Sequence, residues 1–216
     1  MVQWPMLDNV PRKTGDTRER LLELAESAVL AKGFAATSID ELIAAAGISK
    51  SGFFYHFKDK GELAKGLLLR YLAQDHAVLE NLFRRGDELN EDPLQGFLVG
   101  LKLFAEVLAD LPEAHPGCLA ASFAYQDQLF NDEVRKLNAD GMLAWRNRFG
   151  ERLRLIAERY PPVHPVDLDA LADTACTLVE GGLILGRVLQ DTTIVPRQVL
   201  LFRDFVRLIF TPAPAG

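Results

Sequence analysis

Apolar side chains recur every three or four residues along nearly the whole chain, whereas the strict alternation of half-buried strands is almost absent. In an early segment, for example, Leu21, Ala25 and Val29 share one helical face, and charged side chains cover the opposite face. No internal repeat or low-complexity tract interrupts this pattern. The sequence therefore predicts an all-α protein.

Breaks in the pattern divide the chain into about nine helices. Glycines and prolines, which commonly end helices or precede new ones, separate the periodic segments. The expected helices lie near residues 17–32, 38–46, 50–56, 60–85, 93–110, 118–130, 132–160, 167–190 and 196–210. Residues 1–15 show little periodicity and are predicted to form a mobile arm.

Composition is typical of a soluble globular protein: 49% of the 216 residues are hydrophobic and 25% are charged. Each long apolar stretch is interrupted before it reaches the roughly 18 residues that a membrane span needs. The segment Met1 to Pro11 shows no secretory signal. We therefore expect a cytoplasmic protein with no membrane partner.

The formal net charge of −6 is unevenly distributed. Residues 1–60 carry eight Lys/Arg and eight Asp/Glu, so the whole acidic excess lies in residues 61–216. Lys50, Lys58 and Lys60 fall in one short stretch. Because binding to phosphates needs only a local basic face, the acidic average is compatible with a sequence-specific DNA-binding protein.

Two short helices around a glycine turn form a candidate helix-turn-helix. The first helix has capping-box spacing at its start, either Ser38 with Glu41 or Thr37 with Asp40, and ends before Gly47. After a short turn, a new helix begins and runs over residues 50–56. Such a pair places its second helix in the major groove of DNA. An ordinary corner of a helical protein is the alternative interpretation.

The continuous string from 33 to 63, GFAATSIDELIAAAGISKSGFFYHFKDKGEL, resembles the DNA-binding domain of the TetR family of transcriptional regulators. The resemblance extends from Thr17 to about Leu68. It implies a helix-turn-helix DNA-binding domain over 16–61, following the arm of residues 1–15. A ligand-binding and dimerisation domain would occupy 62–216.

The same resemblance assigns roles to individual residues in DNA binding. Thr37 would cap the second helix and contact a phosphate, and Lys50 would contact a guanine edge. Other contacts would come from the helix start and from the residues that follow it. The full set implied is Thr37, Lys50, Ser51, Gly52, Tyr55, His56 and Lys60. Arg12 and Lys13 of the arm are further candidates, for the minor groove.

Phe54 departs from the family pattern, which usually has a tyrosine at this position whose hydroxyl contacts a phosphate. Phe54 has no hydroxyl, so we expect it to pack in the core, with Tyr55 supplying the lost contact. Phe53 and Phe57 are likewise expected in the core.

The resemblance also implies that central helices of the second domain surround a ligand cavity. The helix predicted near 93–110 carries an unbroken apolar stripe, which by itself is equally typical of a packed core. A small apolar or aromatic effector would contact Phe97, Leu101, Phe104, Phe123, Tyr125, Gln126, Trp145 and Phe149.

The last two predicted helices are expected to form a homodimer interface, as they do in the TetR family. Glycines inside the first of them suggest close approach of another helix, because each glycine costs roughly 1 kcal/mol in a helix relative to alanine. The candidate contacts are Gly182, Gly186, Phe202, Val206 and Ile209. Packing within the chain is the alternative.

Function follows from the resemblance: a sequence-specific transcriptional regulator, a repressor that a small ligand releases from a pseudo-palindromic double-stranded DNA operator. A thiol-based redox-responsive regulator using Cys118 is one alternative, and a helical ligand carrier or enzyme without a DNA role is another. Catalytic motifs and metal-ligand spacings are absent from the sequence, so we expect no enzyme, cofactor or metal. Two cysteines, Cys118 and Cys176, give no disulfide framework.

Overall fold

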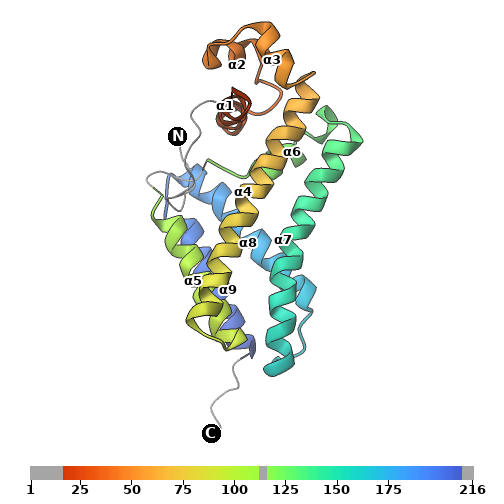
Figure 1. The fold of residues 1–216 in the computed structure, drawn as a ribbon. Coiled ribbons are helices and arrows are strands. Elements are labelled where there is room, and N and C mark those ends of the chain that lie inside the picture. Colours follow the sequence, from red (N-terminus) through yellow and green to blue (C-terminus); the bar gives the residue numbers. More distant parts are fainter. Residues whose placement is uncertain (1–16, 112–115, 211–216) are drawn as a thin grey trace. The chain divides into compact units, whose positions relative to one another are not determined.

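The prediction of an all-α fold is confirmed. The computed structural model describes residues 17–111 and 116–210, and within these ranges it contains α-helices, one 3₁₀ turn and no strand (Figure 1). The helices are α1 (Thr17–Lys32), α2 (Ile39–Ala46), α3 (Lys50–His56), α4 (Lys60–Leu89), α5 (Pro93–Ala109), α6 (Leu119–Ala124), α7 (Asp132–Arg159), α8 (Leu168–Leu189) and α9 (Ile194–Phe210). The arm residues Arg12 and Lys13 lie outside the described residues.

Two of the expected boundaries differ for clear physical reasons. Helix α4 continues through Gly86, where the missing side chain allows α5 to approach closely: a Cβ on Gly86 would lie 2.3 Å from the carbonyl oxygen of Gly96. Gly86 is therefore a packing position and not a helix end. Helix α9 begins at Ile194, so that Pro196 occupies the first turn, where its missing N–H is not needed.

The helix predicted over 118–130 is divided in the structure. Helix α6 ends at Ala124, and after Tyr125 and Gln126 a 3₁₀ turn, η1 (Asp127–Leu129), follows. Gln126 leaves the helical conformation, with φ −125° and ψ 28°. Its side chain forms a hydrogen bond to the backbone far earlier in the chain, as described below.

The described chain forms two compact units, residues 17–75 with 116–142 and residues 76–111 with 143–210. In the first unit, α1, α2 and α3 pack with the start of α4 and with α6. Its core includes Leu21, Leu22, Ala25, Val29, Phe34, Leu42, Phe53, Phe57, Leu67, Phe123 and Phe130. The predicted domain boundary after residue 61 stays a prediction.

Aromatic rings form the centre of the second unit. Phe149 of α7 lies 5.6 Å from Phe83 and 6.2 Å from Phe97 and Phe202, measured between ring centroids. These rings are almost fully buried. Helix α9 packs against both α5 and α8 within this unit.

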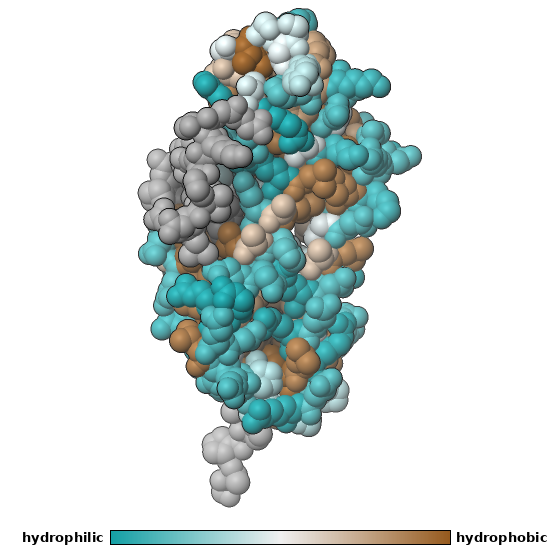
Figure 2. Space-filling view, in the orientation of Figure 1, coloured by the Kyte–Doolittle hydropathy of each residue, from teal (hydrophilic) through white to brown (hydrophobic). Residues whose placement is uncertain are grey.

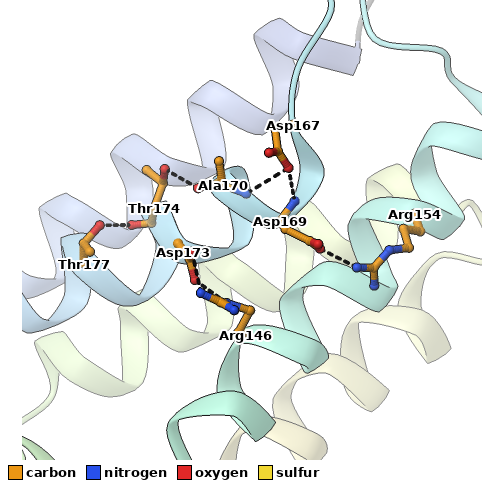
Figure 3. Close-up of polar contacts among 8 residues, drawn as sticks. All are labelled: Arg146, Arg154, Asp167, Asp169, Ala170, Asp173, Thr174 and Thr177. Atoms are coloured by element: carbon orange, nitrogen blue, oxygen red, sulfur yellow. Dashed lines mark hydrogen bonds and ion pairs between the residues drawn. The ribbon is translucent and has the colours of Figure 1, made fainter.

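Ion pairs connect α7 to α8 within the second unit. Arg146 donates two hydrogen bonds to the carboxylate of Asp173, at 2.5 and 2.8 Å, and Arg154 pairs with Asp169 (Figure 3). Asp167 caps the first turn of α8 by accepting from the amides of Asp169 and Ala170. The orientation of α8, which carries exposed apolar residues described below, is thus fixed by bidentate pairing as well as by packing.

Candidate nucleic-acid interface

The turn between α2 and α3 is built from local capping bonds. The Ser38 hydroxyl accepts from the amide of Glu41 at 3.2 Å, so Ser38 is the cap and one of the two predicted alternatives is confirmed. Gly47 adopts the left-handed conformation that ends α2, with φ 67°. Ser49 then caps α3 by accepting from the amide of Gly52 at 3.1 Å. Only Ile48 lies between these two terminal residues, which makes the turn tight.

Helix α3 has a buried face and an exposed face. Phe53 and Phe57, four residues apart, are buried, which confirms their predicted core roles. Lys50, Ser51, Phe54 and Tyr55 are exposed on the rest of the helix surface. We call these four residues the α3 face. The expectation that Phe54 packs in the core is wrong, since 44% of its surface is exposed.

Lys50 and Ser51 are accessible at the start of the α3 face. The Lys50 side chain is 70% exposed, and its ammonium lies 3.8 Å from a carboxylate oxygen of Asp40. The Ser51 hydroxyl lies 2.9 Å from that of Ser49. Exposed ion pairs of this kind contribute little, so Lys50 is available to another partner. Gly52 is half-buried, and a Cβ there would make only ordinary contacts.

Tyr55 and His56 follow on the last turn of α3. Tyr55 is 84% exposed, and its ring lies 5.0 Å from the half-buried ring of His56, in an edge-on arrangement. Their predicted contacts with DNA stay predictions.

Thr37 does not have the role that the sequence suggested. It caps no helix; its side chain is buried, its hydroxyl donates to the carbonyl of Gly33 at 3.0 Å, and its amide donates to the carbonyl of Phe34 at 3.2 Å. Both of its donors are therefore occupied inside the protein. Thr37 stabilises the α1–α2 turn, and Ser38 takes the capping position.

Lys60 also has an internal role. Its ammonium donates to the carbonyl oxygens of Phe34, at 2.8 Å, and Ala35, at 3.4 Å, and lies 4.6 Å from the centre of the Phe34 ring. Burial lowers the pKa of Lys60 below its usual 10.5, an effect that nearby Glu41 opposes. The lysine thus stabilises the turn after α1.

Gln126 was predicted to contact a ligand, but its side chain binds the turn that follows α1. Its side-chain oxygen accepts from the amide of Ala35 at 3.0 Å. Beside it, the ring of Phe34 packs against those of Phe123 and Phe130, which stack on one another at 4.4 Å. No local sequence signal reveals this contact, because it joins residues 91 positions apart.

The eight predicted ligand contacts separate into two groups. Tyr125 is 76% exposed and Gln126 binds the α1–α2 turn, so neither side chain lines the interior of a bundle. Phe123 belongs to the first unit. The remaining five lie in the second unit, where Trp145 is half-buried and the others are buried: Phe97, Leu101, Phe104, Trp145 and Phe149.

The predicted dimer contacts largely face into the chain itself. Gly182 and Gly186 approach α9, where a Cβ on Gly182 would meet Val195 at 3.3 Å, and both Phe202 and Val206 are buried. Ile209 is half-buried. Intrachain packing, the alternative interpretation, therefore accounts for the four residues that are buried.

A different set of apolar side chains on the same two helices is exposed. Val188 of α8 and Leu208 of α9 are each 72% exposed. The complete set, which we call the α8–α9 apolar set, is Ile184, Leu185, Val188, Leu189, Leu200, Leu201, Phe205 and Leu208. Most of the described surface visible in Figure 2 is hydrophilic, with separate apolar patches.

Cys118 occupies the cap position of α6, where its sulfur accepts from the amide of Ala121 at 3.4 Å. It also contacts Tyr71, whose pKa is raised well above 10 by burial and, to a smaller extent, by the neighbouring Cys118 and Asp75. Both cysteines are half-buried thiols. Among the described residues, no group of three His, Cys, Asp or Glu side chains could hold a metal ion, and no helix could cross a membrane.

A tight glycine turn followed by a short helix with an exposed polar and aromatic face defines a helix-turn-helix DNA-binding protein. Comparison with known proteins supports this class and also identifies a family. Residues 21–67 match the family described as bacterial regulatory proteins, tetR family. Residues 21–67 therefore form a helix-turn-helix domain of the TetR type, and similarity to transcriptional regulators extends along most of the chain.

Individual relatives show the same relationship. The chain is 22% identical to the uncharacterised HTH-type transcriptional regulator YxaF of Bacillus subtilis, over 83% of this chain and 89% of that protein. It is 33% identical to the HTH-type transcriptional repressor NemR of Escherichia coli, over 33% of this chain and 36% of that protein.

Solved structures support the fold over nearly the full length. The reduced form of E. coli NemR matches with a TM-score of 0.74 at 20% identity, covering 92% of this chain and all of that chain. A TetR-family regulator from Agrobacterium tumefaciens matches with a TM-score of 0.73 at 19% identity, covering 90% and 98%. At these low identities, the similarity to the solved structures is a similarity of fold.

Proposed function

We propose that the protein is a cytoplasmic repressor that binds a pseudo-palindromic operator as a homodimer and leaves it when a small apolar or aromatic ligand binds. The observation that carries the proposal is the α3 face, which presents Lys50, Phe54 and Tyr55 to solvent at the end of a tight turn. Lysine is suited to guanine O6 and N7, and tyrosine to backbone phosphates.

DNA binding is tested with the double variant Lys50→Ala with Tyr55→Ala. We expect loss of binding to the protein's own upstream DNA, measured by fluorescence anisotropy. The matched control is Lys136→Ala with Tyr125→Ala, which removes a lysine with a 75% exposed side chain and a tyrosine that is 76% exposed from elsewhere on the surface. The α3 contact model is refuted if the two double variants bind DNA equally well.

Dimerisation is proposed to use the α8–α9 apolar set. Its eight exposed apolar side chains lie on two helices that pack against each other, and exposed apolar surface of this kind is typical of interaction sites. Two-fold symmetry would present two α3 faces to successive turns of DNA. Leu208→Glu should shift the sedimentation coefficient from dimer to monomer. Leu89→Glu, at a 68% exposed position on α4, should not.

Ligand binding is proposed within the second unit, around Phe97, Phe104 and Phe149. Trp145 lies 5.7 Å from Phe149 and 6.4 Å from Phe104, so its fluorescence should report an aromatic ligand there. In a Trp4→Phe background Trp145 is the sole tryptophan. Quenching that titrates together with operator release would support the proposal; operator release without any change at Trp145 would contradict it.

A thiol-responsive regulator is the second candidate, and the contact of Cys118 with the buried Tyr71 favours it over a role for Cys176. Oxidation of the sulfur would disturb the α6 cap and the tyrosine together. Cys118→Ser should then abolish oxidant-induced release from DNA, with Cys176→Ser as the control. An unchanged response in Cys118→Ser would exclude this candidate.

A further inference from the structure

Phe54 is an exposed aromatic residue at the centre of a surface that is otherwise polar. It lies four residues after Lys50 and three after Ser51, so these two exposed side chains are its neighbours on the helix surface, and the exposed Tyr55 follows it. The other phenylalanines of this segment, Phe53 and Phe57, are buried. Packing therefore does not explain Phe54, whose ring remains 44% exposed.

The Phe54 ring is nevertheless held in place from behind. Its centroid lies 5.4 Å from that of Phe53, with the two planes at 86°, an edge-to-face arrangement. Phe53 in turn contacts Phe57 at 5.7 Å. The exposed ring thus contacts buried aromatic rings on one side and solvent on the other.

The chemistry of the ring restricts what it can recognise in DNA. Phenylalanine has no donor or acceptor, so it cannot bind a phosphate or the polar edge of a base. The one apolar group in the major groove is the 5-methyl group of thymine. Because residues four apart are separated by about 6 Å along a helix, Phe54 and Lys50 reach base pairs about two steps apart.

We propose that Phe54 is a specificity-determining residue that contacts the 5-methyl group of a thymine in each operator half-site. This thymine lies within one to three base pairs of the guanine contacted by Lys50. The inference rests on the proposed DNA-binding role of the α3 face. It adds a hydrophobic selection for thymine over cytosine and uracil to the polar selection by Lys50.

The test uses an operator selected from random double-stranded DNA by the wild-type dimer. Each thymine of a half-site is replaced in turn by deoxyuridine, symmetrically in both half-sites, which removes the methyl group and leaves base pairing intact. At one position the substitution should weaken wild-type binding about fourfold per half-site, or roughly 15-fold for the dimer, from the burial of one methyl group on each side.

Protein variants connect that effect to Phe54. Phe54→Ala should bind the thymine and uracil operators equally, whereas Phe54→Leu should keep a preference for thymine. Tyr55→Ala should weaken binding to both operators by the same factor, because its proposed contact is with the backbone. Fluorescence anisotropy at one fixed salt concentration measures all of these affinities.

The possible failures are distinguishable. If the wild type selects a defined operator but tolerates deoxyuridine at every thymine, the methyl contact is refuted while DNA binding stands. The same conclusion follows if Phe54→Ala still discriminates against uracil. If no sequence is selected at all, both this inference and the proposed function are overturned.

Discussion

Arg70 of α4 pairs with three glutamates of α1, and replacing it should destabilise the protein in a pH-dependent way. Its guanidinium contacts Glu19 and Glu26 and lies 3.7 Å from Glu23. The Arg70 side chain is only 14% exposed, and that of Glu26 is 20% exposed. One cation thus compensates three carboxylates along one face of α1.

The size of the effect follows from this partial burial. Breaking a buried ion pair costs about 3–5 kcal/mol, and an exposed pair contributes about 0–1 kcal/mol. Because Arg70 and Glu26 are mostly buried whereas Glu19 and Glu23 are exposed, Arg70→Met should lower the free energy of unfolding by an intermediate amount, about 2 kcal/mol near neutral pH. For a chain of this length, that corresponds to roughly 4–8 °C in Tm.

The direction of the pH dependence follows from Glu26. Burial raises its pKa above the usual 4.5, and Arg70 opposes this. A raised folded-state pKa means that ionisation of Glu26 disfavours folding, so its favourable contribution is present at low pH and is lost as pH rises through the folded pKa. Without Arg70 that pKa rises further, and the deficit of the variant should shrink as pH falls from neutral towards about 5.

Thermal unfolding of wild type and Arg70→Met at several pH values, at one protein concentration, measures the deficit. Adding Glu26→Gln to Arg70→Met should recover part of the lost Tm at neutral pH. Lys136→Met is the matched control, since Lys136 forms only an exposed pair with Asp140. A deficit of equal size at pH 5 and pH 7.5 would refute the electrostatic explanation and would assign the role of Arg70 to packing of its stem.

Three further changes test other parts of the structure. Asp40→Asn removes an acidic group from beside the α3 face, so DNA affinity should rise, more at low than at high salt; titrations showing no change would contradict this. Gly86→Ala should lower Tm, because its Cβ would meet backbone at 2.3 Å, whereas Gly181→Ala, with no atom within 4 Å, should not; equal Tm values would contradict the close approach. Gln126→Ala should cost about 1 kcal/mol and speed hydrogen exchange at the Ala35 amide; unchanged exchange there would show that the hydrogen bond is dispensable.

The sequence predicted best what depends on neighbours in the chain. The caps at Ser38 and Ser49 act on amides three residues away, and the left-handed Gly47 ends its own helix. Such local rules suffice for the positions of α2 and α3. Spacing alone did not decide Phe54, which lies only three residues before the buried Phe57, and the absence of a hydroxyl was wrongly interpreted as a sign of burial.

The errors at Lys60 and Gln126 concern partners that are distant in the sequence. Lys60 finds its carbonyl partners 26 and 25 residues earlier, and Gln126 pairs with an amide 91 residues earlier. Periodicity identifies that α9 has apolar faces, but not which of them pairs within the chain. Phe202 is buried and Leu201, its neighbour in sequence, is exposed. Which face of α9 is buried depends on where α5 and α8 pack against it, and that is not encoded in the periodicity of α9 alone.

The contacts of Phe34 have a practical consequence for building hybrid regulators. A chimera that joins residues 1–61 to a foreign effector module would leave behind Phe123, Phe130 and Gln126, which belong to the same compact unit as α1 to α3. The transplanted segment would then expose the Phe34 ring and leave the Ala35 amide without its acceptor. A working graft should carry residues 116–142 with the amino-terminal helices, or should redesign the surface on which Phe34 rests.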